Sequence, residues 1–331
     1  MMATAPTDTR GESPRGLSRV LRTRESGTLL GLLVLCAGLF VATPFFGTLD
    51  NLANVAEQSA LIGVLAIGMT FVILAGGIDL SVGSVVALSG VVAAIGVHRG
   101  WPLLIALGAG VLTGAAAGLC NGALVTFGRL PPFIATLGMM SAARGAALML
   151  ADGRPITGFP AALRQLATAR VSGIPLPVVI MLALYAMAHV VLSRTVLGRY
   201  TYAIGGNEDA AELCGINVRR YKMVVYAIAG VMAAVSAILL MARLNSAQPI
   251  AGIGYELDAI AAVVIGGTSL LGGAGSVVGT LIGALIMSVL RNGLNLLGVT
   301  SYVQQIAIGA VIVAAVLLDM ALQRRAQRSH T

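Results

Sequence analysis

The sequence predicts an all-α polytopic membrane protein with about ten transmembrane helices. Of the 331 residues, 57% are hydrophobic and only 10% are charged, and the mean hydropathy is +0.93. A soluble globular protein needs more polar surface than this composition supplies. Apolar runs close to the roughly 20 residues that a bilayer requires recur along nearly the whole chain. These observations place the protein in a membrane before any motif is considered.

Taken in order, the apolar runs define the individual candidate spans. The run at 256–267 is too short to cross a bilayer alone, and the run at 132–151 contains Arg144, so we expect ten spans to within one. The spans lie at 28–46, 52–75, 80–97, 102–127, 132–151, 175–193, 221–242, 256–267, 275–291 and 301–319.

Positive charge divides the chain into a transmembrane domain at 28–320 and three basic segments. A tail at 1–27 with five arginines, a polar loop at 194–222 and a second tail at 321–331 carry most of the basic residues. Since Lys and Arg concentrate in cytoplasmic segments beside spans, we expect both tails and the loop to be cytoplasmic, and we expect no nucleic-acid partner. The loop at 151–174 also carries three arginines, yet ten spans place it outside.

The stretch AGGIDLSVGSVVALSG sets one carboxylate, Asp79, between two apolar runs. An ionised Asp at the centre of a bilayer helix costs roughly 2.5 to 3.5 kcal/mol, so it is expected to be functional or tightly paired. Gly76 and Gly77 interrupt a helix, which a membrane tolerates only where the break is buried in protein or lines a wet cavity. Two interpretations remain open: a break on a translocation path together with Ser81 and Asn121, or a surface loop in which Asp79 caps the next helix.

A second glycine-containing break resembles the first one. The segment IGGTSLLGGAGSVV, with Gly266 and Gly267, echoes AGGIDLSVGSVV apart from a two-residue insertion, and Ser269 takes the place of Asp79. This pattern predicts an internal repeat, with a solute path at the interface of its halves. The alternative is that small residues recur because membrane helices must pack closely.

The loop at 194–222 contains a short predicted helix with explicit end signals. An Asn can cap its start, two acidic residues follow in the first turn, and a glycine ends it. The helix is too short and too weakly amphipathic to anchor in lipid, so either a protein partner receives it or it is a solvated connector. The residues concerned are Asn207, Glu208, Asp209, Ala211, Leu213 and Gly215.

Signals for catalysis and for bound cofactors are lacking. The sequence contains no G-x-x-x-x-G-K-[ST] string and no H-E-x-x-H string, and its three histidines and three cysteines are scattered. We therefore expect no enzyme activity, no metal site and no cofactor in this chain. Aromatic residues make up only 5%, which favours a weakly interacting passage over a tight binding site for a solute.

Four segments in order resemble the permease subunits of ABC importers for monosaccharides, the group of the ribose, xylose, arabinose and galactose permeases. They are GGIDLSVGS, NGALVTFGRLPPFIATLG, GRYTYAIGGNEDAAELCGI and IGGTSLLGGAGSVVGTLIGALI. The resemblance extends over roughly residues 45–320 and into the related branched-chain amino acid permeases. It implies a multi-pass permease of the bacterial inner membrane that imports a pentose or hexose by alternating access.

The same resemblance implies partners. The loop at 199–215 is similar to the coupling helix that docks on a separate ATPase subunit, which holds ATP and magnesium, and Glu208, Asp209 and Leu213 are the expected docking residues. A periplasmic sugar-binding protein and a second permease, identical or related, complete the importer. The competing hypothesis is an ion-coupled secondary carrier in which Asp79 is the proton or cation site.

Overall fold

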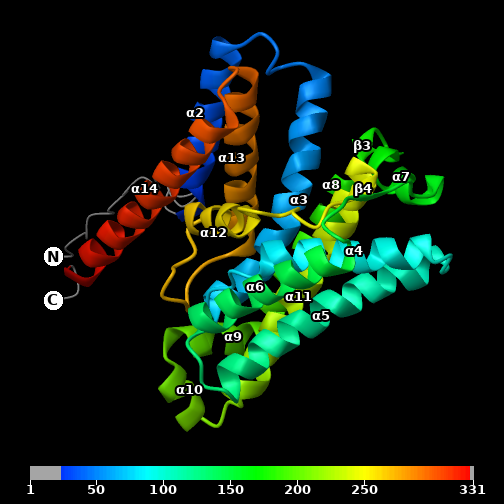
Figure 1. Cartoon of the computed structure of the whole chain (residues 1–331). Helices are drawn as coiled ribbons and strands as arrows, with labels where there is room; N and C mark the ends of the chain where they lie inside the picture. Colours follow the sequence, from blue (N-terminus) through cyan, green and yellow to red (C-terminus); the bar gives the residue numbers. More distant parts are fainter. Residues whose placement is uncertain (1–23, 329–331) are drawn as a thin grey trace, which may run out of the picture.

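The computed structural model describes residues 24–328, and these residues form a helical bundle (Figure 1). The predicted tail therefore lies almost wholly outside the described residues, as do 329–331. The helices are α2 (Arg24–Ala42), α3 (Leu49–Leu74), α4 (Val82–His98), α5 (Leu103–Thr126), α6 (Pro132–Leu150), α7 (Ala161–Thr168), α8 (Leu176–Arg194), α9 (Val196–Gly206), α10 (Glu208–Leu213), α11 (Val218–Leu244), α12 (Tyr255–Ile265), α13 (Val277–Leu296) and α14 (Ser301–Arg328). Two short antiparallel pairs, β1 (Ile156–Thr157) with β4 (Ser246–Ala247) and β2 (Arg170–Val171) with β3 (Ile174–Pro175), complete the fold.

The helical class is confirmed, and the helices coincide with the predicted apolar runs. Within the described residues, six helices are long and apolar enough to cross a membrane: α3, α5, α6, α8, α11 and α13. Apolar stretches of α2, α4 and α14 are shorter. As expected, α12 has only 11 residues and is too short to cross alone. The protein is therefore an all-α multi-pass membrane protein, and ten spans remain a prediction.

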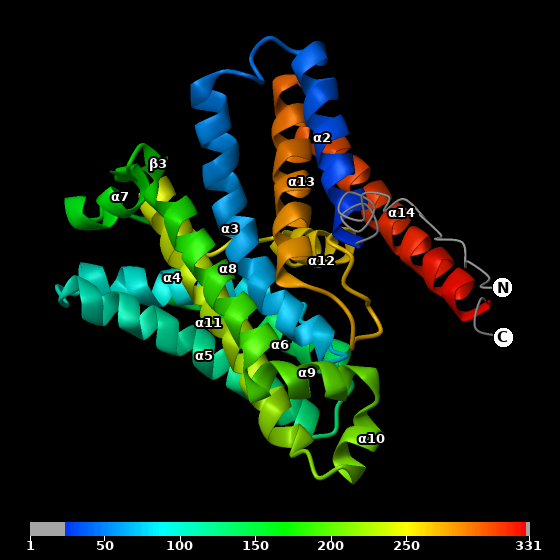
Figure 2. The same ribbon diagram turned by 180° about the vertical axis from the view of Figure 1, so that it is seen from behind.

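Helix α3 forms the centre of the bundle. It is buried continuously over 59–74 and packs against α8, α11, α12 and α13. Both views show it between α13 on one side and α8 with α11 on the other (Figures 1 and 2). A helix that is apolar all round can be this buried because no side of it needs to meet a polar surface. The elements that bear on function are consequently arranged around α3.

Helices α5 and α11 are in backbone contact along a glycine face of α5. A Cβ added to Gly118 would lie 2.2 Å from the carbonyl oxygen of Tyr226, and one added to Gly114 would lie 2.3 Å from that of Gly230. Small residues at such positions let two helix axes approach closely, which maximises van der Waals contact within a membrane. The two helices therefore form a single packed pair.

The two ends of the bundle carry different structures, and we name them after their helices. At the α10 end, α9 and α10 precede the start of α11. At the α7 end, α11 finishes at β4, which pairs with β1 shortly before α7 (Figure 1). The arginines of the 151–174 segment lie at the α7 end, opposite the loop at 194–222, which is the arrangement that the ten-span prediction required.

Candidate functional site

The structure brings Asp79 and Ser81, in the turn between α3 and α4, together with Asn121 of α5 in a buried hydrogen-bond network. Asp79 is 1% exposed, and its Oδ1 accepts hydrogen bonds from the Ser81 amide at 2.8 Å and the Ser81 hydroxyl at 2.6 Å. The Asn121 amide donates to the same hydroxyl at 2.8 Å. The interpretation as a surface loop is therefore wrong, because the carboxylate is enclosed by protein. It instead shapes the turn that precedes α4.

The second break has the same local turn at the equivalent position. The Ser269 hydroxyl accepts a hydrogen bond from the Leu271 amide, two residues on, at 3.3 Å. Gly76 and Gly267 each adopt a left-handed conformation, with φ of 76° and 88°, which glycine does without steric penalty. At both breaks a helix ends, a glycine adopts the left-handed conformation, and a side-chain oxygen accepts a hydrogen bond from the backbone amide two residues on. This correspondence favours a structural role for Asp79 over an ion-binding one.

The other predicted glycines serve close packing. A Cβ on Gly77 would lie 2.6 Å from the Tyr226 hydroxyl, and one on Gly266 would lie 2.4 Å from the Gly279 carbonyl oxygen. Neither glycine lies on the lining of a described cavity. Their assignment to a translocation path stays a prediction, and the contacts of the described residues explain them by helix packing.

Replacing Asp79 distinguishes the turn from an ion-binding site. We expect Asp79→Asn to keep transport within about threefold of wild type at every pH tested, because the amide oxygen still accepts the Ser81 hydrogen bond. Asp79→Ala leaves that buried amide unpaired, which costs about 1 to 3 kcal/mol. Thermal unfolding in detergent and solute uptake across pH 6 to 8 are the measurements. Loss of uptake in Asp79→Asn with unchanged thermal stability would contradict the turn role.

A polar cavity of about 400 Å³ lies among α3, α11, α12 and α13. It is formed by the first half of α3, the last turn of α11 and the start of α12, so it lies toward the α7 end. Its apolar walls include Leu61, Leu240 and Met287. Its hydrogen-bonding groups, which suit a hydroxyl-rich solute, come from Gln58, Arg243, Tyr255, Asp258, Ser288 and Arg291.

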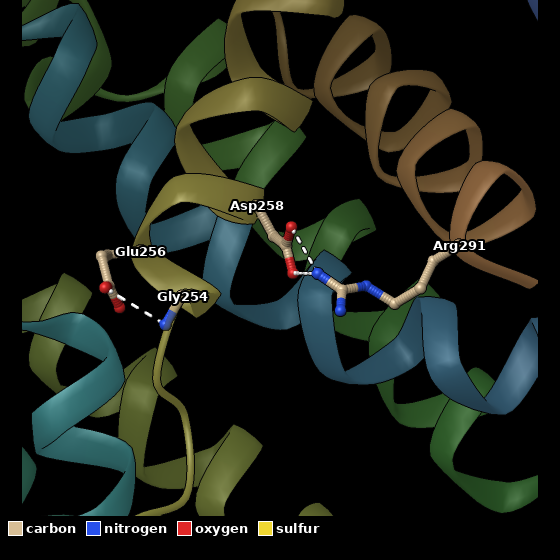
Figure 3. Close-up of polar contacts among 4 residues, drawn as sticks. All are labelled: Gly254, Glu256, Asp258 and Arg291. Carbon is tan, nitrogen blue, oxygen red and sulfur yellow. Dashed lines mark hydrogen bonds and ion pairs between the residues drawn. The ribbon is translucent and has the colours of Figure 1, made fainter. Parts of the chain in front are cut away.

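An ion pair fixes one wall of this cavity (Figure 3). Arg291 Nη2 on α13 donates to both carboxylate oxygens of Asp258 on α12, at 2.6 and 2.9 Å. The Asp258 side chain is 2% exposed, whereas that of Arg291 is 40% exposed and borders the cavity. The sequence analysis missed this pair. Its signal was present, because acidic residues begin the run at 256–267 and an arginine ends the run at 275–291.

Glu256 points away from that pair, toward α4 (Figure 3). Its Oε1 accepts a hydrogen bond from the Gly254 amide at 3.2 Å, and its Oε2 lies where a Cβ on Gly83 would be 2.3 Å away. Nearby, Arg144 on α6 donates to the carbonyl oxygens of Pro249 and Ala251 at 2.8 and 2.7 Å. These hydrogen bonds explain why an arginine is present in the apolar helix α6: Arg144 holds the segment that leads into α12.

Removing the arginine tests how much the ion pair holds α12 against α13. We expect Arg291→Gln to lower the free energy of unfolding by about 3 kcal/mol, the lower end for breaking a buried pair, since it leaves the Asp258 carboxylate unpaired while Arg291 itself is 40% exposed. The double variant Asp258→Asn with Arg291→Gln should recover part of that loss. The control is Arg243→Gln in the same cavity: its contact with Glu57 is 3.9 Å and partly exposed, and its 3.0 Å hydrogen bond to Asn54 is exposed, so a smaller loss of about 1 kcal/mol is expected. Equal thermal stability of Arg291→Gln and Arg243→Gln would contradict this account.

The predicted short helix is α10, with the predicted end residues. The Asn207 side chain accepts a hydrogen bond from the Ala210 amide at 2.9 Å, and Gly215 follows the helix with a left-handed φ of 80°. Glu208 forms an ion pair with Lys222 at 2.5 Å. Ala211 is buried with Ile204 and Val218, so it holds α10 to its neighbours.

The outer face of α10 is free of such contacts. Leu213 is 89% exposed, and Asp209 is also exposed. A leucine that is almost fully exposed on a helix held from behind can contribute apolar area to a partner without any rearrangement. Leu213 is therefore exposed on the outer side of α10 and Ala211 is buried against its neighbours, and their docking role stays a prediction.

Helix α9, which the sequence analysis did not predict as a separate helix, connects α10 to both breaks. Gly205 lies against the end of α3, where an added Cβ would be 1.8 Å from the Leu74 carbonyl oxygen. That oxygen accepts a hydrogen bond from the Gly273 amide at 3.0 Å. The Tyr202 hydroxyl donates to the Gly275 carbonyl oxygen at 2.9 Å. Helix α9 therefore links α10 by direct contacts to the end of α3 and to the segment at 266–276.

A helical multi-pass fold with interrupted helices, a polar cavity and an exposed helix joined to the breaks through α9 is the arrangement expected of a membrane transport subunit. Residues 51–316 match the family described as the branched-chain amino acid transport system permease component, and the chain belongs to this family. It is therefore a permease component and not an enzyme. No solved structure matches the chain at a significant level.

Curated relatives cover nearly the whole chain. The ribose import permease protein RbsC of Escherichia coli K12 is 50% identical over 299 residues, which is 89% of this chain and 93% of the relative. RbsC of Bacillus subtilis is 48% identical over 298 residues, or 89% of this chain and 92% of the relative. The D-allose transport system permease protein AlsC of E. coli K12 is 40% identical over 300 residues, or 90% and 92%. The resemblance to sugar permeases is thus confirmed.

Proposed function

We propose that this chain is the membrane-spanning subunit of an ATP-driven importer that moves a monosaccharide, such as ribose or a related pentose or hexose, across the bacterial inner membrane. The observation that carries the proposal is the exposed, capped α10, which follows directly on α9, the helix that contacts both helix breaks. A self-sufficient carrier needs no such exposed helix. The names of relatives as similar as RbsC favour ribose as the first solute to test.

In this proposal α10 docks on an ATPase subunit that binds ATP and magnesium. Leu213 supplies apolar contact, and Asp209 and Glu208 supply charge around it. ATP binding and hydrolysis move α10, and α9 passes the displacement to the end of α3 and to the 266–276 segment. Two permease subunits, identical or related, then open the solute passage first to one side of the membrane and then to the other. With ten spans, both termini and α10 share the cytoplasmic face.

The polar cavity serves as the outer part of the solute passage. A sugar offers hydroxyl groups that donate and accept hydrogen bonds, and the cavity provides an amide, a tyrosine hydroxyl and guanidinium groups. Because tight binding would retain the solute, a passage of this kind needs only weak contacts. A periplasmic sugar-binding protein supplies the selectivity and releases the sugar at the α7 end.

Co-purification and reconstitution test this proposal. The tagged chain is solubilised from membranes of its native host, and the co-purifying chains are identified by mass spectrometry. We expect an ATPase with a Walker motif and a soluble binding protein, and we expect ATP-dependent ribose uptake when the set is reconstituted in liposomes. If the chain purifies alone and moves solute in liposomes without ATP, the ion-coupled carrier replaces this proposal. If ATP-dependent uptake is observed for a different solute, the proposed importer function stands and only the assignment of ribose as its solute is wrong.

A further inference from the structure

A second, larger hollow lies on the flank of the bundle and is unrelated to the polar cavity. It is a groove of about 820 Å³ whose lining comes from α3, α5, α8 and α11. Phe71, Leu119, Met187, Val224 and Val231 are among the side chains that make it apolar. Several of them are substantially exposed, for example Met187 at 54% and Leu119 at 43%. The groove is therefore open sideways, where a membrane-embedded protein meets lipid.

One end of this groove is cationic. Arg219 and Arg220, in the first turn of α11, line it together with the apolar residues. Both are exposed, and neither forms an ion pair with any residue in the described part of the chain. Since α11 has 27 residues, about 40 Å of helix, its first turn lies at headgroup level when the helix crosses a bilayer. Two free guanidinium groups at that level suit a phosphate.

We propose that this groove binds an anionic phospholipid, with an acyl chain along the apolar lining and the phosphate at Arg219 and Arg220. The charge pattern decides the occupant. A phospholipid supplies an apolar chain and an anion in the right order along the groove, whereas an apolar helix of another protein leaves both arginines without a counter-charge. Both walls, α5 and α8, are apolar helices that are mostly unburied within the chain, so lipid reaches the groove directly.

The proposed lipid occupies a defined position in the molecule. The groove is floored by α3 and α11, so its occupant touches both the central helix and the helix that begins beside α10. An occupied groove fills the gap between α5 and α8 at the α10 end. The site is independent of which solute is transported, and it can be tested on the purified permease alone.

Native mass spectrometry of the permease released from nanodiscs tests the proposal. The nanodiscs contain equal amounts of phosphatidylglycerol and phosphatidylcholine with the same acyl chains. We expect the wild type to retain one phosphatidylglycerol in at least fivefold preference over phosphatidylcholine. Arg219→Gln with Arg220→Gln should reduce that preference to about one. Val224→Trp, which fills the groove from an exposed position, should reduce retention of both lipids.

A matched control separates the groove from general surface charge. Arg129→Gln with Arg199→Gln removes two exposed arginines that do not line the groove, and it should keep the wild-type preference. Equal retention of the two lipids by the wild type would overturn the proposal. So would a preference unchanged in both groove variants, or replacement of the lipid by a co-purifying protein that cross-links to position 224. Thermal unfolding of each variant verifies that the compared proteins are folded.

Discussion

Gly205→Ala should reduce transport at least tenfold and lower the melting temperature by roughly 5 °C. A single methyl group there would lie 1.8 Å from the Leu74 carbonyl oxygen and 2.6 Å from the Gly273 amide nitrogen. Both are backbone atoms, so a change of side-chain rotamer cannot relieve the overlap, and α9 must move away from α3. Overpacking of this kind costs about 1 to 3 kcal/mol, or roughly 2 °C per kcal/mol in a chain of this size.

The neighbouring residue provides the control for this prediction. Gly206→Ala adds the same methyl group one position later, where no atom lies within 4 Å of the new carbon. Transport and melting temperature should therefore stay at wild-type values. The measurements are sugar uptake by the reconstituted importer and thermal unfolding of the purified chain. If the two alanine variants behave alike, contact between α9 and the end of α3 does not carry the coupling.

Leu213→Glu should separate ATP hydrolysis from transport without harming the permease itself. Leu213 is 89% exposed, so the folded chain tolerates a polar residue. Docking in the proposed interface would bury the new carboxylate, at about 3 kcal/mol, which is roughly a hundredfold in affinity. We expect solute-stimulated ATP hydrolysis to fall to its basal rate and uptake to fall at least tenfold, with unchanged membrane insertion.

Leu213→Met is the conservative counterpart, because methionine preserves apolar area at the same position. It should retain more than half of wild-type uptake. ATPase activity, uptake and the amount of ATPase co-purified with each variant are measured on the same preparations. Undiminished coupled transport by Leu213→Glu would remove α10 as the docking element, while leaving the family membership untouched.

Local signals in the sequence predicted several features in detail. Asn207 and Gly215 delimit α10 as expected, because capping depends on neighbouring residues only. The apolar runs predicted the helices for a similar reason: in a bilayer, backbone groups must pair within the segment. Gly76 and Gly267 marked the two breaks correctly.

For features that depend on contacts between distant segments, the sequence supplied the residues but not their partners. The pairing of Asp258 with Arg291 requires α12 to lie beside α13. Arg144 made the predicted span at 132–151 uncertain, because the carbonyl oxygens that accept its hydrogen bonds lie on the segment before α12, about a hundred residues away. Asp79 was expected either on a path or at the surface, and only the fold shows it enclosed with Ser81. In each case the partner, and not the residue type, determines the role.

The glycine contact between α5 and α11 has a mechanical consequence. Where two helices touch backbone to backbone, at Gly114 and Gly118, little side-chain material remains that can deform. Any tilt of α11, which runs about 40 Å from Val218 to Leu244, would therefore carry α5 with it as one stiff body. A tilt of about 5° at the α10 end displaces the other end by roughly 3.5 Å. That end carries Leu240 and Arg243, which line the polar cavity, so a tilt of this size would change the width of the cavity.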